Sequence, residues 1–221
     1  MKKLFVFDWN GCLLADTKIC WKANNYVLEH FKRKPISLKR FQETIVVPIQ
    51  EFYKLNGFTE KEVQTIGPQI SKIFHEKYAQ TAKNCRTRKG TVELLDWIRK
   101  QGSTAIILSN HHLQELEQQL KRLNLRDYFS EIFANSDQHE VVLRKNKQEK
   151  LENYLKTQNI GKKDIVILGD SVEEIHVGKH LGITSIAVTG GNYSKARLLA
   201  EKPDYLVNHL MEVKRIFEKE F

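Results

Sequence analysis

Three groups of polar residues follow short apolar runs in this 221-residue sequence, and their side chains suit chemistry at phosphorus. Asp8 follows one run, Ser109 with Asn110 follows a second, and Gly169 with Asp170 follows a third. Two converging carboxylates would repel each other without a cation, and Mg²⁺ accepts one or two carboxylates beside water and phosphate oxygens. A carboxylate can also attack phosphorus to give an aspartyl-phosphate, while hydroxyl, amide and lysine donors spread the charge of the transferring group.

These groups meet only if the apolar runs are strands of one parallel sheet. Apolar strands alternating with amphipathic helices are typical of a parallel sheet covered on both faces, and such sheets bind ligands at the carboxyl ends of their strands. The sequence therefore predicts an α/β fold with a Rossmann-like parallel core. The expected strands are 4–7, 104–108, 132–134, 165–168 and 184–188, the expected helices are about 91–100, 112–123, 147–158 and 173–181, and a strand–helix pair follows Pro203.

The segment 16–85 has a different pattern, which predicts a small α-helical domain inserted after the first strand. Asp16 and Thr17 can cap a helix to about residue 33, and Thr59 can cap a second helix that Gly67-Pro68 breaks, with a further helix from about 69 to 83. The segment has 12 lysines and arginines against 7 aspartates and glutamates, which supplies +5 of the net charge of +9. We expect a core domain of residues 1–15 and 86–221 and a helical domain of residues 16–85.

The three polar groups resemble the motifs of the haloacid dehalogenase (HAD) superfamily of phosphohydrolases, in the phosphoglycolate-phosphatase-like branch with a helical cap. The resemblance covers nearly the whole chain. The first motif, usually D-x-D-G-T-L, reads D-W-N-G-C-L from Asp8 to Leu13, and the fourth, usually G-D-S-x-x-D, reads G-D-S-V-E-E from Gly169 to Glu174. Ser109 opens the second motif.

The resemblance implies an HAD-like hydrolase with an aspartyl-phosphate mechanism and bound magnesium. Asp8 would attack phosphorus and bind Mg²⁺. The backbone carbonyl of Asn10 and the carboxylate of Asp170 would be further ligands. Glu174 stands where the family usually has aspartate and would hold the metal through a water.

The resemblance also implies a phosphate clamp and a cap that closes over a small phosphorylated substrate. Ser109 and a lysine would hold the phosphoryl oxygens, and Asn110 and Gly11 would help bind the substrate. Both Lys145 and Lys147 lie at plausible distances before the fourth motif. We prefer Lys147, which opens a predicted helix.

The first motif departs from the family pattern at Asn10, where family phosphatases have an aspartate that protonates the leaving oxygen and then activates water. An amide does neither, and general acid–base catalysis contributes about 10²–10⁴-fold in rate. Phosphate esters with good leaving groups would suffer least. His111 and His112 are the candidates for a replacement acid, since histidine titrates in the right range, and slow turnover without any replacement is the alternative. Cys12 replaces the usual threonine and removes no metal ligand.

Composition and motif content argue against several other classes of protein. The longest apolar runs have four residues against the ~20 of a membrane-spanning helix, and three cysteines make neither a disulfide framework nor a zinc box, so we expect a cytoplasmic protein without a membrane partner. The charge of +9 suits nucleic acid, yet no nucleic-acid motif accompanies it. A metal-free dehalogenase has no need of the acidic pair Asp170 and Glu174. A non-catalytic phosphate- or partner-binding protein on the same scaffold is the alternative that Asn10 leaves open.

Overall fold

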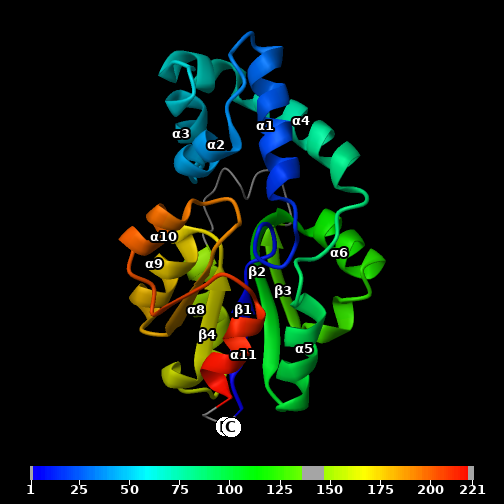
Figure 1. Cartoon of the computed structure of the whole chain (residues 1–221), viewed down its shortest axis with the longest axis vertical. Coiled ribbons are helices and arrows are strands. Elements are labelled where there is room, and N and C mark those ends of the chain that lie inside the picture. The colour runs from blue at the N-terminus through cyan, green and yellow to red at the C-terminus, as the bar shows by residue number, and fades with distance from the viewer. Residues whose placement is uncertain (1, 136–146, 219–221) are drawn as a thin grey trace.

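The computed structural model describes residues 2–135 and 147–218, and its described strands form one parallel sheet in the order β3-β2-β1-β4-β5-β6 (Figure 1). The first strand of the chain lies between β2 and β4, so its carboxyl end is flanked by those of both neighbours. The predicted α/β fold with a parallel core is confirmed. The strands are β1 (Leu4–Phe7), β2 (Thr104–His112), β3 (Glu131–Asn135), β4 (Ile165–Gly169), β5 (Thr184–Val188) and β6 (Tyr205–Val207).

Helices cover both faces of the sheet because successive strand side chains point to opposite sides. Phe5 and Phe7 of β1 belong to the apolar cluster that includes residues of α5, α6 and α11, whereas Leu4 and Val6 belong to the cluster that includes α8 and α9. The helices of the first face are α5 (Thr91–Lys100), α6 (Leu113–Arg122) and α11 (Met211–Phe217). Those of the second are α8 (Lys147–Leu155), α9 (Val172–Leu181) and α10 (Lys195–Ala200).

A separate group of helices lies beyond the carboxyl ends of the strands, at the top of Figure 1. This helical layer has its own apolar cluster, with Val27, Phe41, Phe52 and Tyr53 among its fully buried members. Its helices are α1 (Thr17–His30), α2 (Leu38–Thr44), α3 (Ile49–Leu55) and α4 (Glu60–Ala82). The division of the chain into two domains at residues 15 and 86 stays a prediction.

The break predicted at Gly67-Pro68 is wrong, because α4 continues through Pro68 to Ala82. Proline removes one backbone hydrogen bond of a helix. Here the packing of Val63 and Ile70, one on each side of it, holds both halves in one helix. Most of the stability of a helix in a protein comes from packing of this kind rather than from propensity.

The second strand also differs from its prediction, since β2 runs on to His112 and contains Ser109 and Asn110 instead of ending before them. Its pairing with β3 becomes irregular between Leu108 and His112, so the end of the strand is distorted.

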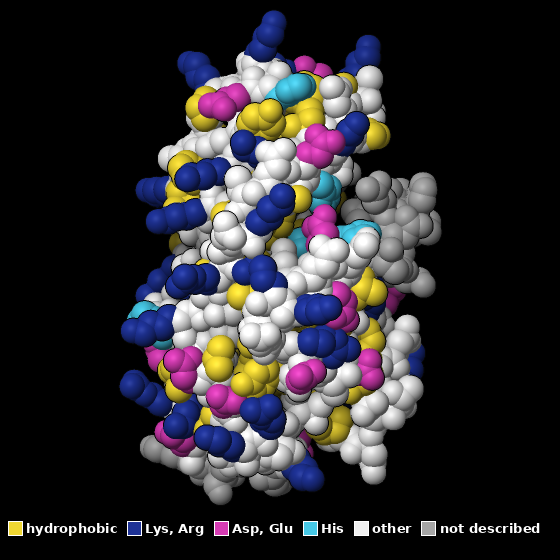
Figure 2. Space-filling model, turned by 90° about the vertical axis from the view of Figure 1, so that its right-hand side faces the viewer, with side chains coloured by type: hydrophobic (Ala, Val, Ile, Leu, Met, Phe, Trp, Pro, Cys, Tyr) yellow, Lys and Arg dark blue, Asp and Glu magenta, His cyan; other side chains and the backbone are white. Residues whose placement is uncertain are grey.

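No helix of the described ranges is both long and apolar enough to cross a membrane. Lysine and arginine side chains are spread over the face in Figure 2, with acidic side chains among them, instead of forming one patch.

Candidate active site

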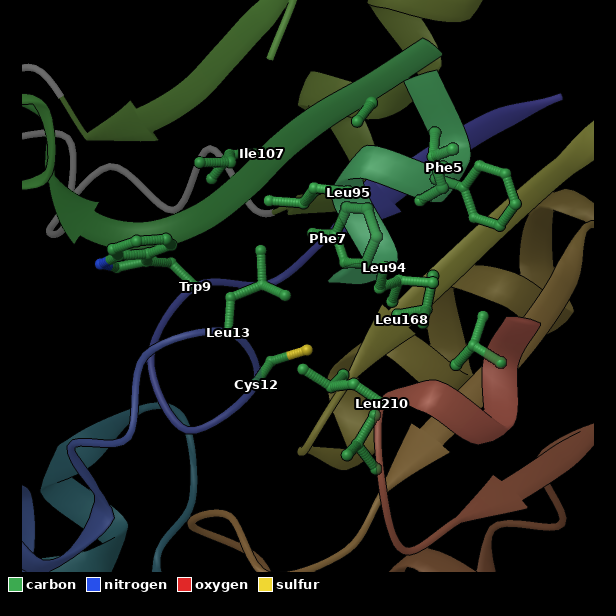
Figure 3. Close-up of a cluster of buried hydrophobic side chains, with 14 of the residues drawn as sticks. Phe5, Phe7, Trp9, Cys12, Leu13, Leu94, Leu95, Ile107, Leu168 and Leu210 are labelled. Atoms are coloured by element: carbon green, nitrogen blue, oxygen red, sulfur yellow. The ribbon is translucent and has the colours of Figure 1, made fainter. Parts of the chain in front are cut away.

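The loop that leaves β1 is held in place by its apolar side chains. Trp9, Cys12 and Leu13 are completely buried and join the cluster that contains Phe7 (Figure 3). Cys12 therefore takes part in core packing in place of the family's threonine. Because these side chains are fixed in the core, the polar residues between them are held at the carboxyl end of the sheet.

Asp8 lies in a buried cluster of charges with Lys147, the first residue of α8, and Glu174 of α9. The Lys147 ammonium donates to Asp8 Oδ1 at 2.6 Å and to Glu174 Oε1 at 2.5 Å. Glu173 Oε2 lies 3.7 Å from the same nitrogen. The side chains of Lys147, Asp8 and Glu174 are 4%, 8% and 2% exposed. Residues far apart in sequence thus meet where two strands end and two helices begin. Lys145 lies outside the described residues.

The cluster holds more negative than positive charge, and its pKa values reflect this. Burial, with Glu174 in support, raises the pKa of Asp8 to about 7 although Lys147 opposes the rise. Burial and the neighbouring Asp8 raise the pKa of Asp170 well above its usual range. Burial alone would lower the pKa of Lys147, but Asp8 and Glu174 raise it well above its usual range. The site therefore favours binding of an additional cation.

Asp170 packs directly against the loop after β1. A Cβ at Gly11 or Gly191 would overlap the Asp170 carboxylate, and Gly11 has the left-handed φ of +74°. Both glycines therefore let the backbone approach the carboxylate closely. Asp170 Oδ2 accepts from the backbone N–H of Asn192 at 2.5 Å.

The oxygen atoms around Asp8 and Asp170 fit a hard divalent cation. Within residues 2–135 and 147–218, no group of three or more His, Cys, Asp or Glu side chains is arranged to hold a metal. Mg²⁺ does not need one, since one or two carboxylates suffice beside carbonyl, water and phosphate oxygens. Asp8, Asp170 and the Asn10 carbonyl would supply that set. Asn192, whose backbone N–H bonds Asp170, also has its Oδ1 buried without a hydrogen-bond partner in the described part of the chain, so polar capacity is left over beside these oxygens.

Glu174 has its contacts elsewhere. Its Oε2 accepts from the backbone N–H and the hydroxyl of Ser171, which caps α9, while its Oε1 accepts from Lys147. The contacts therefore fix Glu174 as the anchor of Lys147. The expected water-mediated contact of Glu174 with a metal stays a prediction.

The residues of the second predicted motif lie at the edge of this cluster. Ser109 is 1% exposed, and its Oγ accepts from the backbone N–H of His111. Asn110 Nδ2 donates to Glu173 Oε2 at 2.8 Å, which links it indirectly to Lys147. The backbone N–H of Gly11 donates to Asp16 Oδ1 and to Leu14 O, so this N–H is already engaged within the protein. The substrate-binding roles of Asn110 and Gly11 stay predictions.

Sequence reasoning assigned Asp16 to a helix cap, whereas its carboxylate lies in the site. Asp16 occupies the N-cap position of α1 without making a side-chain capping bond. Its Oδ2 accepts from Asn10 Nδ2 at 2.7 Å and from the Tyr78 hydroxyl at 2.6 Å. Tyr78 comes from α4, so this contact joins the helical layer to the first motif. No sequence signal pointed to Tyr78, because its partner lies 62 residues earlier.

Both candidate replacement acids, His111 and His112, lie at the end of β2, and their role stays a prediction. His111 lies beside Tyr78, with ring centroids 5.8 Å apart, and burial lowers its pKa to about 4. It is therefore uncharged near neutral pH. Its Nε2 lies 3.4 Å from Glu115 Oε2. His112 follows at the start of α6.

The loop after β5 was also missed, although it too follows a strand. Besides Asn192, it offers the carbonyl of Thr189 to Arg88, whose guanidinium also donates to Gly11 O. Arg88 thus joins this loop to the loop after β1. The two consecutive glycines at 190–191, one residue after an apolar strand, are the signal that could have found it.

The helical layer also contacts the loop after β5. Gln42 Nε2 donates to Gly191 O at 2.8 Å, and Ser194 N donates to Gln42 O at 3.0 Å. Arg197 of α10 donates to Ile45 O at 2.6 Å, at the end of α2. The helical layer is therefore closed over the site in this structure, at Tyr78 on one side and at α2 on the other.

Comparison with known proteins places the chain in a family. Residues 5–188 match the model of the haloacid dehalogenase-like hydrolases. The chain is 22% identical to phosphoglycolate phosphatase 1 of Pseudomonas aeruginosa, over 96% of this chain and 79% of the relative. It is 23% identical to the pyrophosphatase PpaX of Bacillus mycoides, over 97% and 96%. A haloacid dehalogenase-like hydrolase structure from Streptococcus pneumoniae superposes with a TM-score of 0.80 at 18% identity, covering 98% of each chain. The family expected from the motifs is confirmed, and the chain belongs to the haloacid dehalogenase-like hydrolases.

Proposed function

We propose that this protein is a magnesium-dependent phosphohydrolase that acts on a small phosphorylated compound through an aspartyl-phosphate on Asp8. The observation that carries the proposal is the buried contact of Asp8 with Lys147 among an excess of carboxylates, in a chain of this hydrolase family. The names of the phosphoglycolate phosphatase and pyrophosphatase relatives support the same reaction class.

Each residue of the cluster would have a distinct role in the reaction. Lys147 holds Asp8 Oδ1, so Oδ2 is the oxygen that would attack phosphorus while the bond to the leaving oxygen breaks. Lys147 and Ser109 would also bind the phosphoryl oxygens. Water would then attack phosphorus, release phosphate and restore the Asp8 carboxylate. Magnesium, held by Asp8, Asp170 and the Asn10 carbonyl, would supply positive charge beside the transferring group.

The helical layer would exclude water from this reaction and contact the rest of the substrate. Its contacts at Tyr78, Gln42 and Ile45 support this role, because the first two join it to loops of the site and the third joins it to α10. Opening of the layer would be needed for exchange of substrate and product. Its net positive charge suits an anionic compound.

The test is hydrolysis of p-nitrophenyl phosphate by the wild type and by Asp8→Asn, with and without Mg²⁺. That ester has a good leaving group, so the missing acid at residue 10 matters least. We expect magnesium-dependent activity in the wild type and a fall of about 10⁴-fold or more in the variant. Mass spectrometry of the acid-quenched wild type should show a phosphorylated peptide containing Asp8. Equal rates in the two proteins would contradict the proposal.

A non-catalytic phosphate-binding protein is the second candidate, favoured by the amide of Asn10. It predicts no turnover in either protein, while calorimetry still detects binding of inorganic phosphate in the presence of Mg²⁺. The Asn10→Asp variant would then separate a site silenced by one side chain, which gains turnover, from a site built only to bind.

A further inference from the structure

The amide of Asn10 is fixed by two hydrogen bonds from its nitrogen. Asn10 Nδ2 donates to Asp16 Oδ2 at 2.7 Å and to the Tyr78 hydroxyl oxygen at 3.0 Å. The same hydroxyl donates to Asp16 Oδ2 at 2.6 Å. The three side chains therefore form a closed triangle, which we call the amide triangle.

The amide triangle allows one orientation of the Asn10 amide. A carboxylate only accepts hydrogen bonds, and the Tyr78 hydroxyl spends its single proton on Asp16, so at Asn10 it too can only accept. Rotating the amide by half a turn would bring its oxygen against these two acceptors. Gly11 N, which donates to Asp16 Oδ1 at 2.7 Å, holds the carboxylate from its other side.

The surroundings keep the amide triangle rigid. Asp16 is 1% exposed and Tyr78 is 3% exposed. The Tyr78 ring packs against Phe74 on its own helix and His111 on β2, at 5.8 Å between centroids in both cases. Rotation of the amide would have to break the contacts of two buried partners from different segments of the chain.

Both amide protons are therefore committed, and the Asn10 oxygen is the atom left for the reaction. An amide oxygen accepts a hydrogen bond, for example from the attacking water, but gives no proton to a leaving oxygen. The nearby His111 does not replace it, because burial lowers its pKa to about 4. An alkyl phosphate would then have to release a strongly basic alkoxide, which is slow.

We propose that the site selects phosphorylated compounds whose leaving group departs without a proton, namely phosphoanhydrides and acyl phosphates, over alkyl phosphate monoesters. The inference rests on the proposed function. In the first step Asp8 forms a bond to phosphorus, and the electron pair of the broken bond goes to the leaving oxygen. That oxygen belongs to a phosphate or a carboxylate, both weak bases that leave as anions. Water then attacks the aspartyl-phosphate, and its proton passes to solvent.

The test compares substrates by the basicity of their leaving group. A series of substituted phenyl phosphates keeps the size nearly constant, and the slope of log(kcat/KM) against leaving-group pKa measures how much protonation assists departure. We expect a steep negative slope for the wild type with Mg²⁺. Pyrophosphate and acetyl phosphate should exceed glycerol 2-phosphate by about 10²-fold or more in kcat/KM. Comparing kcat/KM for pyrophosphate with that for acetyl phosphate shows whether the site prefers phosphoanhydrides or acyl phosphates.

Two variants place a carboxyl at residue 10. Asn10→Asp introduces it beside Asp16, and Asn10→Asp combined with Asp16→Asn exchanges the two side chains and so preserves an amide–carboxylate pair in the amide triangle. We expect the exchanged variant to flatten the slope. Its kcat/KM for glycerol 2-phosphate should rise by about 10²–10⁴-fold, whereas its kcat/KM for acetyl phosphate should change less than tenfold. The single variant controls for the effect of two adjacent carboxyls.

The outcomes distinguish the inference from the function beneath it. A flat slope in the wild type would overturn the inference and leave the phosphohydrolase intact. So would an equally steep slope in the wild type and both variants, because residue 10 would then not set the preference. Absence of hydrolysis of every substrate by every protein, with Mg²⁺ present, would overturn the proposed function and the inference with it.

Discussion

Two buried carboxylates near the start of the chain, Asp8 and Asp16, have opposite surroundings. Counted as whole residues, Asp8 is 6% exposed and Asp16 is 1% exposed, and burial raises the pKa of both. Asp8 contacts the charged Lys147, and the negative Glu174 contacts the same ammonium. Asp16 instead accepts hydrogen bonds from the three neutral donors described above, the amide of Asn10, the N–H of Gly11 and the hydroxyl of Tyr78.

The difference suits the Asp8 carboxylate to a reaction and the Asp16 carboxylate to holding its neighbours in place. Around Asp8 the negative charges exceed the positive ones, so the site gains from binding a cation. Around Asp16 the hydrogen-bond donors match the carboxylate, so nothing further is needed. Buried charges are stable in proteins only with such partners. The predictions below test this contrast by removing partners from one carboxylate or the other.

The largest effect is expected for Lys147→Met. It leaves Asp8 and Glu174 buried without their shared cation, and breaking a buried ion pair from one side costs about 3–5 kcal/mol. The free energy of unfolding of the metal-free protein at pH 8 should fall by that amount, and kcat/KM for p-nitrophenyl phosphate by about 10²-fold or more. Lys156→Met, at an exposed lysine just beyond the same helix, is the matched control. Unchanged stability would contradict the charge balance inferred for Asp8.

The partners of Asp16 are neutral, and we expect the same of His111, which packs beside Tyr78. Burial lowers the pKa of His111 from 6.5 to about 4. Between these two pH values, the histidine is therefore protonated in the unfolded chain and neutral in the folded protein. The free energy of unfolding should therefore decrease as the pH falls from 6.5 to 4, by about 3 kcal/mol on account of this residue. Above pH 6.5 the stabilising contribution is fully present.

Urea titrations of the wild type and His111→Gln at several pH values measure this difference. The variant should lose most of the decline with acid, and His180→Gln, at an exposed histidine of α9, should retain it. His75 also has a lowered pKa through burial and contributes in the same direction, so some decline remains in His111→Gln. Identical pH profiles for all three proteins would show that His111 accepts a proton in the fold.

A smaller pair of effects with opposite signs is expected for Asp8→Asn and Asp16→Asn. The pKa of Asp8 is raised, so its contribution to stability is lost as the pH rises from about 4 to 7, and the neutral amide avoids this loss. Metal-free Asp8→Asn should therefore equal or exceed the wild type by about 1 kcal/mol at pH 8. Asp16→Asn puts donors where three donors already point and should be about 2 kcal/mol less stable. Loss of stability in both would remove the contrast.

The half of the site around Asp8 was predictable because it follows from sheet geometry. Asp8 and Asp170 each lie at the end of a recognisable apolar run, and parallel strands bring such ends together whatever the loops do. Lys147 was selected because it opens a helix, and the structure places its ammonium on Asp8. Local pattern was sufficient for the two aspartates, since the strand before each one sets its position. The lysine was sought because of the family resemblance, and only its preference over Lys145 came from local pattern.

The half around Asp16 was not predictable from local pattern. Asp16 looks like a helix cap, and only the packing of α4 against α1 brings the Tyr78 hydroxyl to it. The same packing carries α4 through Pro68, against the rule that a proline ends a helix. Contacts between elements, rather than the composition of either, decide both features.

The smallest effect is expected for Arg197→Gln, at the second contact between the helical layer and the rest of the protein. Arg197 donates to Ile45 O at 2.6 Å and to Gln42 O at 3.2 Å, and it stacks over Tyr193. These bonds hold the layer closed without touching Asp8 or the amide triangle. Without these bonds, the free energy of closing the helical layer should be less favourable by about 1 kcal/mol. We therefore expect KM to rise about fivefold and kcat to change less than twofold.

Steady-state kinetics of Arg197→Gln beside Lys195→Gln, an exposed position of the same helix, provide the comparison. The 189–192 loop, however, also bonds Asp170 through Asn192 N, and Gln42 bonds its Gly191 carbonyl. If kcat falls together with a rise in the Mg²⁺ concentration needed for half-maximal rate, closure of the layer would be coupled to the position of Asp170. The contact at Arg197 would then act on the half of the site around Asp8, and Tyr78 would be the contact that acts on the half around Asp16.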